Sequence, residues 1–324
     1  MSEYSQSPSN QSPSHEDEID LREHIKVLWK GKLWIIGTTF IAAVISVAIA
    51  LSLPNIYRAE ALLQADEGLG ALSSLANQYG NLASLAGVPL PDVTASDKKA
   101  IGIATLQSRQ FLTNFMGRHN IIPELMAVSA YNVNTGELSY DPTIFDPETR
   151  IWTRDVAPPL QKKPSSQEAF LYMREILSVT EDRLTGFVTV SIEHLSPLIA
   201  YEWVTWLVDD LNREMMLEAT AEAQQSMDFL TDQLANTQVV SLQEVFYRLI
   251  EEQMKTIMLA DTRAEYLFKT IDPATVPELK SGPFRAVICI LGTLLGGILG
   301  LMLVLINQYA FRSKRTSSSL DAIS

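Results

Sequence analysis

The sequence predicts an α+β membrane protein in which two transmembrane helices flank an α/β domain that carries a long helical protrusion. The membrane helices are indicated by two apolar runs without a charged residue, at 33–53 and 286–306. At ~1.5 Å per residue, a run of about 21 residues spans ~31 Å, the thickness of a bilayer core. The protrusion is indicated by residues 198–236, which contain neither proline nor glycine and place apolar residues three or four apart.

Basic residues near the two apolar runs predict the orientation of the chain. Cytoplasmic segments are enriched in Lys and Arg, so both termini are expected in the cytoplasm and residues 54–283 on the opposite side. The first run is interpreted as an uncleaved anchor, because it is longer than the core of a signal peptide and 32 residues precede it. The basic residues that predict this orientation are Arg22, Lys26, Lys30 and Lys32 before the first run, and Arg312, Lys314 and Arg315 after the second.

These features divide the chain into segments. A disordered cytoplasmic tail is expected at 1–18, where Ser, Pro, Gln and Asn dominate. Residues 19–32 suit a short helix lying at the cytoplasmic face of the membrane. The remaining segments are the first transmembrane helix (33–53), an external α/β base (54–196), a long helical hairpin (197–270), a proline-rich segment returning to the membrane (271–283), the second transmembrane helix (284–306) and a cytoplasmic tail (307–324).

The predicted base mixes strands and helices. Strands are expected at 56–64 and 186–193, with a short one at 151–152. Amphipathic helices are expected at 97–119 and at 166–177. Pro123, which follows the first of them, is expected to stop that helix.

Two further stretches of the base are less regular. Residues 129–166 are otherwise expected to be irregular, with turns at Asp141 and Asp146, each followed by proline. Residues 68–91 contain the near-repeat LSSLA and LASLA, interpreted as a compact helix-and-loop element. A mobile segment facing a neighbouring subunit is the alternative.

The helical hairpin is predicted from two long patterns. Residues 197–236 and 241–269 each keep apolar residues at helical spacing, and polar residues at 236–238 indicate the bend between them. The apolar face is wider than one hairpin seam needs, which favours contacts between subunits over a hairpin without a partner. The candidate residues for such contacts are Trp203, Trp206, Leu211 and Met215.

Prolines and glycines distinguish the second membrane run. Proline cannot continue a helix, so Pro273, Pro277 and Pro283 predict a stiff, non-helical strut where the chain meets the membrane. Glycines four residues apart form a stripe that lets another helix approach closely, and we expect a helix of a neighbouring subunit or a partner protein there. The alternative is an ordinary anchor, because glycine is common in membrane helices. The stripe consists of Gly292, Gly296 and Gly300, with Gly297 beside it.

No motif of catalysis or cofactor binding is present. The chain lacks the Walker A, GxSxG, HExxH, CxxC and GxGxxG patterns. Acid pairs such as Asp209–Asp210 are interpreted as solvated helix surface. We therefore expect no catalytic residue, no cofactor and no metal site, and a protein that acts by shape and assembly rather than as an enzyme. The four histidines, which are scattered, are His15, His24, His119 and His194.

Charge and cysteine content narrow the partners. The net charge is −13, and residues 54–283 hold 31 Asp and Glu against 17 Lys and Arg. Such an acidic domain repels phosphates, so nucleic acid is not an expected partner. Membrane lipid is an expected partner because of the two apolar runs. The single cysteine, Cys289, falls inside the second membrane run, so the external domain has no disulfide.

Several stretches together resemble the Wzz chain-length determinants, the class 1 polysaccharide co-polymerases. The resemblance covers Glu18 to Ile306 and is best in the proline-rich segment DPATVPELKSGPFRA (272–286) and the glycine-bearing run after it. The family often has a further proline just past Pro283, which this chain lacks. The other matching stretches are IDLREHIKVLWKGKLWI (19–35), SRQFLTNFMGRHNIIPELMA (108–127), GFVTVSIEHLSPLIAYEWVTWLVDDLN (186–212) and VVSLQEVFYRLIEEQMKTIMLA (239–260).

The resemblance implies a function as well as a fold. It implies a bacterial inner-membrane protein with a periplasmic α/β base, which forms a homo-oligomeric ring, commonly an octamer. Members of the family set the modal length of O-antigen or a related glycan made by a Wzy-type polymerase, and the nascent lipid-linked glycan is a further expected contact. The prolines and glycines named above are implied to shape the polymerase-facing second span. The alternatives are a capsule or exopolysaccharide export partner and, less favoured, a periplasmic sensor.

Overall fold

A computed structural model describes the backbone of residues 29, 31–65 and 95–320, and the side chains of these residues except 95–97 and 308–320. The chain forms two compact units, one of Pro54–Pro283 and the other of Met1–Leu53 with Phe284–Ser324. The predicted tail at 1–18, most of the predicted interfacial helix at 19–32 and the segment 68–91 lie outside the described residues.

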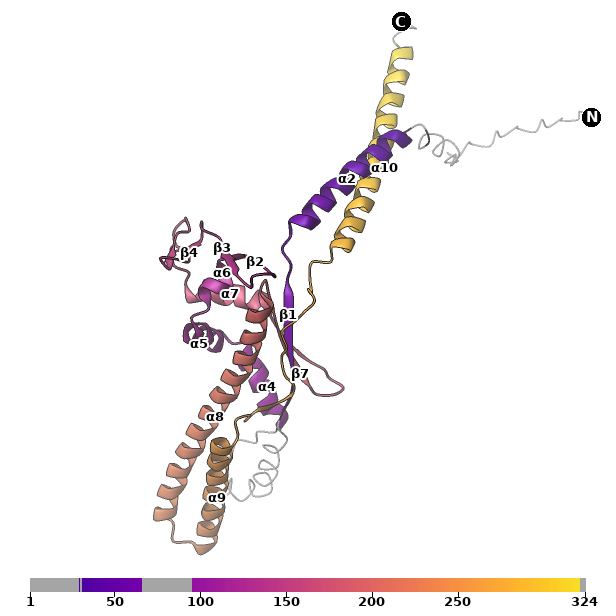
Figure 1. Ribbon diagram of the computed structural model, residues 1–324. Coiled ribbons are helices and arrows are strands. Elements are labelled where there is room, and N and C mark those ends of the chain that lie inside the picture. Colours follow the sequence, from indigo (N-terminus) through magenta and orange to yellow (C-terminus); the bar gives the residue numbers. More distant parts are fainter. Residues whose placement is uncertain (1–28, 30, 66–94, 321–324) are drawn as a thin grey trace, which may run out of the picture. The chain divides into compact units, whose positions relative to one another are not determined.

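The unit that contains the chain ends consists of two long apolar helices. Helix α2 covers Lys32–Ser52 and helix α10 covers Arg285–Leu320, and the two pack side by side (Figure 1). Residues 32–52 and 285–307 are long and apolar enough to cross a membrane. Most of their large apolar side chains are exposed, as expected of helices that lipid surrounds. We refer to α2 and α10 together as the membrane pair.

The second unit, here the α/β unit, is built on a four-stranded antiparallel sheet. Its strand order is β6-β7-β1-β8. Along β1 the buried side chains Tyr57, Ala59 and Ala61 alternate with exposed Arg58 and Glu60, as in a sheet covered on one face. The predicted strands at 56–64 and 186–193 are confirmed. The strands are β1 (Tyr57–Ala65), β6 (Leu177–Glu181), β7 (Val188–His194) and β8 (Phe268–Asp272).

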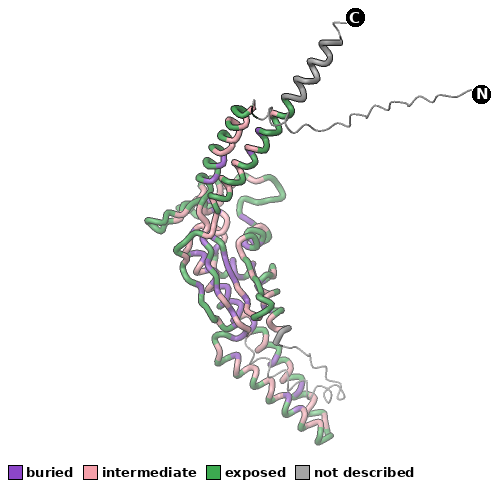
Figure 2. Tube along the Cα trace, turned by 90° about the vertical axis from the view of Figure 1, so that its right-hand side faces the viewer, coloured by how far each residue is buried: buried purple, intermediate pink, exposed green. Residues whose placement is uncertain are grey.

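Helix α8 covers this sheet and then continues beyond it beside α9 (Figure 1). The predicted helix at 197–236 is confirmed as α8, a helix of 40 residues. Burial is concentrated where α8 meets the sheet, and little of the hairpin beyond is buried (Figure 2). The remaining helices are α4 (Ala95–Leu106), α5 (Arg109–His119), α6 (Ile122–Met126), α7 (Ser166–Ile176) and α9 (Val240–Thr262).

Residues 128–152 form two small hairpins. One pairs β2 (Val128–Tyr131) with β3 (Leu138–Tyr140), and the other pairs β4 (Phe145–Asp146) with β5 (Ile151–Trp152). The turns predicted at Asp141 and Asp146 are confirmed, because each carboxylate accepts a hydrogen bond from the backbone N–H two residues on, at 2.9 and 3.0 Å.

Two predicted helices differ from those in the structure. The helix predicted at 97–119 is two helices, because the Ser108 hydroxyl accepts from Phe111 N at 3.2 Å and caps a new helix, α5. Helix α5 ends at His119, as predicted, but the stop is Asn120 in a left-handed conformation and not Pro123, which lies in the first turn of α6. The helix predicted at 241–269 ends at Thr262, and the last part of that stretch enters strand β8.

Candidate functional sites

The glycine stripe of α10 faces α2 of the same chain. A Cβ atom placed on Gly292 would overlap the Ser46 hydroxyl, and one on Gly300 would overlap the Thr38 hydroxyl. A Cβ atom on Gly296 would overlap Ala42 Cβ. Only glycine lets the two backbones come this close. Gly297 lies beside the contact, since its nearest neighbour would be Thr39 Oγ1 at 3.7 Å.

The residues of α2 that meet the stripe are also small, a feature that sequence reasoning missed. Thr38, Ala42 and Ser46 recur every fourth residue, which was the available signal. The Thr38 hydroxyl donates to Trp34 O at 3.0 Å, and the Ser46 hydroxyl donates to Ala42 O at 2.7 Å. Each hydroxyl is thus satisfied by its own helix and the contact with α10 is one of shape. The contact expected with a neighbouring subunit or partner protein stays a prediction.

The proline-rich segment is non-helical up to Phe284, as its three prolines predict. It is also tied to the beginning of β1. Ile56 N donates to Gly282 O at 3.0 Å, and Ser281 N donates to Ile56 O at 2.8 Å. The segment that returns to the membrane is therefore held against the segment that leaves it, within the α/β unit.

Three of the four candidate subunit-contact residues of α8 are buried inside the α/β unit, which corrects the expectation for them, whereas a contact through Trp206 stays a prediction. Trp203, Leu211 and Met215 are 1, 0 and 9% exposed and belong to the core between α8 and the sheet. Trp206 is half-buried, and its ring stacks on that of His119 with centroids 4.5 Å apart. The reason is that the wide apolar face of α8 covers the chain's own sheet.

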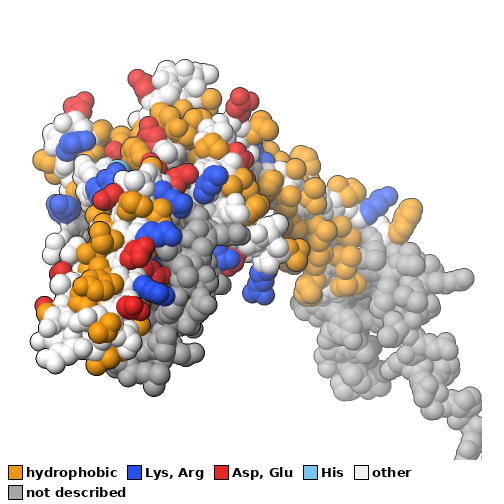
Figure 3. Space-filling model, turned by 90° about the horizontal axis from the view of Figure 1, so that it is seen from below, with side chains coloured by type: hydrophobic (Ala, Val, Ile, Leu, Met, Phe, Trp, Pro, Cys, Tyr) orange, Lys and Arg blue, Asp and Glu red, His pale blue; other side chains and the backbone are white. Residues whose placement is uncertain are grey.

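Exposed apolar residues lie instead on α9. Four of them are more than half exposed, namely Val240, Tyr247, Met254 and Met258, at 70, 61, 57 and 58%. Their spacing of seven, seven and four places them on one face of the helix. Seen from below, hydrophobic side chains lie between charged ones at this end of the molecule (Figure 3). We call these four residues the α9 stripe.

Asp210 was expected on a solvated surface, but it is a buried ion-pair partner. Its Oδ2 atom accepts from Arg118 Nη1 at 2.8 Å and from His119 Nε2 at 3.0 Å, and its side chain is 5% exposed. The neighbouring carboxylate of Asp209 has its pKa raised by burial and by the charge of Asp210. Both partners of Asp210 come from the end of α5, so the pair fastens α5 to α8.

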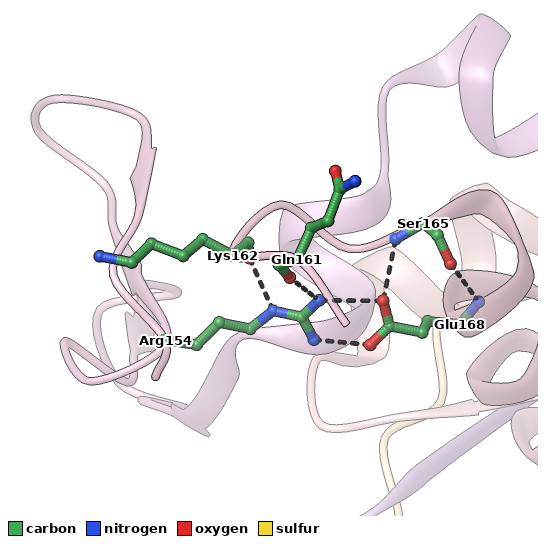
Figure 4. A network of polar contacts seen from close by, with 5 residues as sticks. All are labelled: Arg154, Gln161, Lys162, Ser165 and Glu168. Carbon is green, nitrogen blue, oxygen red and sulfur yellow. Dashed lines mark hydrogen bonds and ion pairs between the residues drawn. The ribbon is translucent and has the colours of Figure 1, made fainter. Parts of the chain in front are cut away.

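A second polar network fastens the segment after β5 to helix α7 (Figure 4). Arg154 donates to both oxygens of Glu168, at 2.8 and 2.9 Å, and to the backbone oxygens of Gln161 and Lys162. Glu168 also closes a capping box with Ser165 at the start of α7. These hydrogen bonds, first that from Arg154, lower the pKa of Glu168 to about 2.

The histidines and acidic side chains of the described residues do not gather into a metal-binding cluster. Within them, no three His, Cys, Asp or Glu side chains come together in a way that could hold a metal ion. His194 is held by Glu124 O and Ser196 N, and His119 by Asp210, so each has a structural partner. The arrangement of these side chains serves packing and fastening.

Comparison with known proteins identifies a family for part of the chain. Residues 17–118 match the family described as Wzz, chain length determinant protein. The matched stretch includes α2, β1, α4 and nearly all of α5, and over these residues it confirms the resemblance to the Wzz family. No curated protein sequence matches the chain.

Two solved structures are similar to the chain. One is a full-length bacterial polysaccharide co-polymerase, with 14% identity and a TM-score of 0.38, covering 92% of this chain and 99% of that one. The other is a fragment of WzzB, a polysaccharide co-polymerase from Salmonella Typhimurium, with 11% identity and a TM-score of 0.33, covering 70% of this chain and 100% of that one.

Proposed function

We propose that this protein, whose residues 17–118 match the chain length determinants of the Wzz family, sets the chain length of a bacterial surface polysaccharide. The polysaccharide is the O-antigen of lipopolysaccharide or a related glycan. The protein acts as a homo-oligomeric scaffold in the inner membrane, beside a Wzy-type polymerase, and forms no glycosidic bond itself. The observation that carries the proposal is the family match.

The architecture supports this role. Two helices able to cross a membrane flank the α/β unit in sequence, so a polymerase within the membrane and a growing glycan outside it are both within reach of one chain. The α9 stripe is an apolar surface that the described part of the chain leaves exposed, which suits contact with a second copy. The second span, which follows the prolines at 273–283 and carries the glycines, remains the proposed polymerase-facing helix.

We place both termini in the cytoplasm and residues 54–283 in the periplasm, as the distribution of Lys and Arg supports. A reporter enzyme active only in the periplasm tests this. It should be inactive when fused after Ser324 and active when inserted at Leu184, a residue 97% exposed in the turn between β6 and β7. Reporter activity at Ser324 would overturn the topology.

A gel ladder of surface polysaccharide tests the function itself. Deleting the gene should replace a modal cluster of chain lengths with a distribution that declines steadily, and restoring the gene should bring the cluster back. Membrane levels of the protein are measured in parallel by immunoblot. A deletion that changes the amount of exported glycan but leaves its length distribution intact would contradict length control and favour an export role.

A further inference from the structure

The glycine stripe of α10 has a fitted counterpart on α2, a helix otherwise treated as an anchor. Gly292 meets Ser46, and Gly296 meets Ala42. One turn further along α10, Gly300 meets Thr38. The α10 numbers rise by four as the α2 numbers fall by four, so the helices run antiparallel in a fixed register.

The fit continues past the glycine stripe, but there the glycine belongs to the α2 side and the side chain to α10. A Cβ atom on Gly31, which precedes α2, would overlap the side chain of Val304 on α10. At each of these four levels one partner is glycine, and at no level do two large side chains meet. Each span therefore leaves room for the side chains of the other.

We propose that Thr38, Ala42 and Ser46 are positioning residues that fix the distance and register of the two spans within one chain. The membrane pair then enters length control as one preformed element; this last step rests on the proposed function. In lipid there is no hydrophobic force between helices, so close van der Waals packing decides their association. Adding a methyl group to one helix at one level should therefore separate the two backbones. Removing a methyl group from the facing residue of the other helix should restore the fit.

The proposal changes where a partner docks on the second span. The glycine face of α10 is covered by α2, so a polymerase helix or a second copy meets the pair on another face. The outward side chains of the pair include Phe40 and Ile41 on α2 and Leu295 and Leu299 on α10. They are 68, 59, 59 and 59% exposed, in that order.

Cysteine cross-linking in native membranes tests the pairing without any glycan. Thr39→Cys and Gly297→Cys are introduced into the full chain with Cys289→Ala, because a Cβ on Gly297 lies 3.7 Å from Thr39 Oγ1, a spacing that suits a disulfide. Mild oxidation should protect both thiols from a mass-tagging maleimide while the protein keeps its monomer size. Phe40→Cys with Gly297→Cys is the matched control and should not cross-link, since Phe40 points outward.

The same experiment decides between the occupants of the stripe. A dimer-sized product from Thr39→Cys with Gly297→Cys would place a neighbouring subunit's span on the stripe and overturn the proposal. Retention of both free thiols, with the protein at its normal level, would overturn it as well.

An exchange of one methyl group tests the fit itself. Gly296→Ala adds a Cβ that overlaps Ala42, so it should lower the yield of the cross-link about fivefold or more. Ala42→Gly removes the overlapped atom and should restore the yield in the double variant. Ala48→Gly, on an exposed part of α2, should not restore it.

The glycan ladder of the same strains separates pairing from function. Gly296→Ala should shorten or broaden the modal length, and Ala42→Gly should restore it. If the cross-link follows the exchange while the ladder does not, the spans are fitted but take no part in length control. If neither changes, the fit between the spans is refuted.

Discussion

At the scale of the residue, Arg154 has the largest set of described hydrogen bonds at one side chain, four in all, to Glu168, Gln161 and Lys162. Arg154→Met keeps the aliphatic part of the side chain and removes all four. We expect the free energy of unfolding of the full-length protein in detergent to fall by about 1–3 kcal/mol near neutral pH, because Glu168 keeps its burial and loses its partner. Chemical denaturation followed by circular dichroism measures this. Arg58→Met is the control, since the partner of Arg58 is exposed and that pair contributes little.

The same pair carries a pH dependence. The pKa of Glu168 is lowered from 4.5 to about 2, first by the hydrogen bonds from Arg154. A lowered carboxylate pKa stabilises the fold above the unfolded value, and the stabilisation is lost as pH falls through the folded value. The difference between wild type and Arg154→Met should therefore shrink as pH falls from about 5 toward about 2. A difference that stays constant across this range would contradict the assignment.

His194 carries a pH dependence of the same sign in a higher pH range. Burial lowers its pKa below 6.5, although the hydrogen bond to Glu124 O opposes the shift. Its Nδ1 accepts from Ser196 N at 3.0 Å, so protonating the ring breaks that bond. The neutral ring stabilises the fold above about pH 6.5, and this contribution is lost as pH falls below it. We expect wild type to lose more stability than His194→Gln between pH about 7 and about 5; equal slopes in a denaturation series would refute this.

At the scale of the element, Asn212 joins α8 to the beginning of β8. Its Oδ1 accepts from Leu267 N and Phe268 N, and its Nδ2 donates to Phe268 O, all at 2.9 Å. Leucine has a volume similar to that of asparagine, but Asn212→Leu leaves three buried backbone groups without their side-chain partner. The free energy of unfolding should therefore fall by at least ~3 kcal/mol. Asn236→Leu is the control on the same helix, because its hydrogen bond is exposed, and it should change stability little. Equal effects of the two changes would contradict this account.

At the scale of the whole molecule, assembly and folding depend on different faces of the hairpin. Met254→Glu together with Met258→Glu places charges on the exposed α9 stripe, so assembly should weaken while the helix content stays unchanged. Leu211→Asp instead buries a charge in the core and should unfold the α/β unit. Light scattering and circular dichroism of the purified protein in mild detergent separate the two outcomes. Wild-type mass in the doubly charged variant would show that the α9 stripe is not a subunit contact.

The sequence by itself determined the features that are local. The two membrane spans, strands β1 and β7 and the length of α8 follow from hydrophobic periodicity and from the absence of proline and glycine, which act within a few turns of the chain. Asn212 was within reach of the same reasoning, because it is a polar residue one turn beyond buried Val208 on α8. The resemblance to a family of known architecture was also carried by residues that lie close together in sequence.

Only the tertiary structure decided which surface covers which. A helical pattern predicts an apolar face but does not name its partner, so Trp203 and Leu211 were expected between subunits and lie against the chain's own sheet. The beginning of β8 is held by hydrogen bonds to Asn212, more than fifty residues away in the sequence. In the same way, the glycines of α10 predicted that another helix packs closely against them. Only the structure showed that this helix is α2 and that Gly296 meets Ala42, about 250 residues away in the sequence. The reason is that van der Waals fit depends on both surfaces at once.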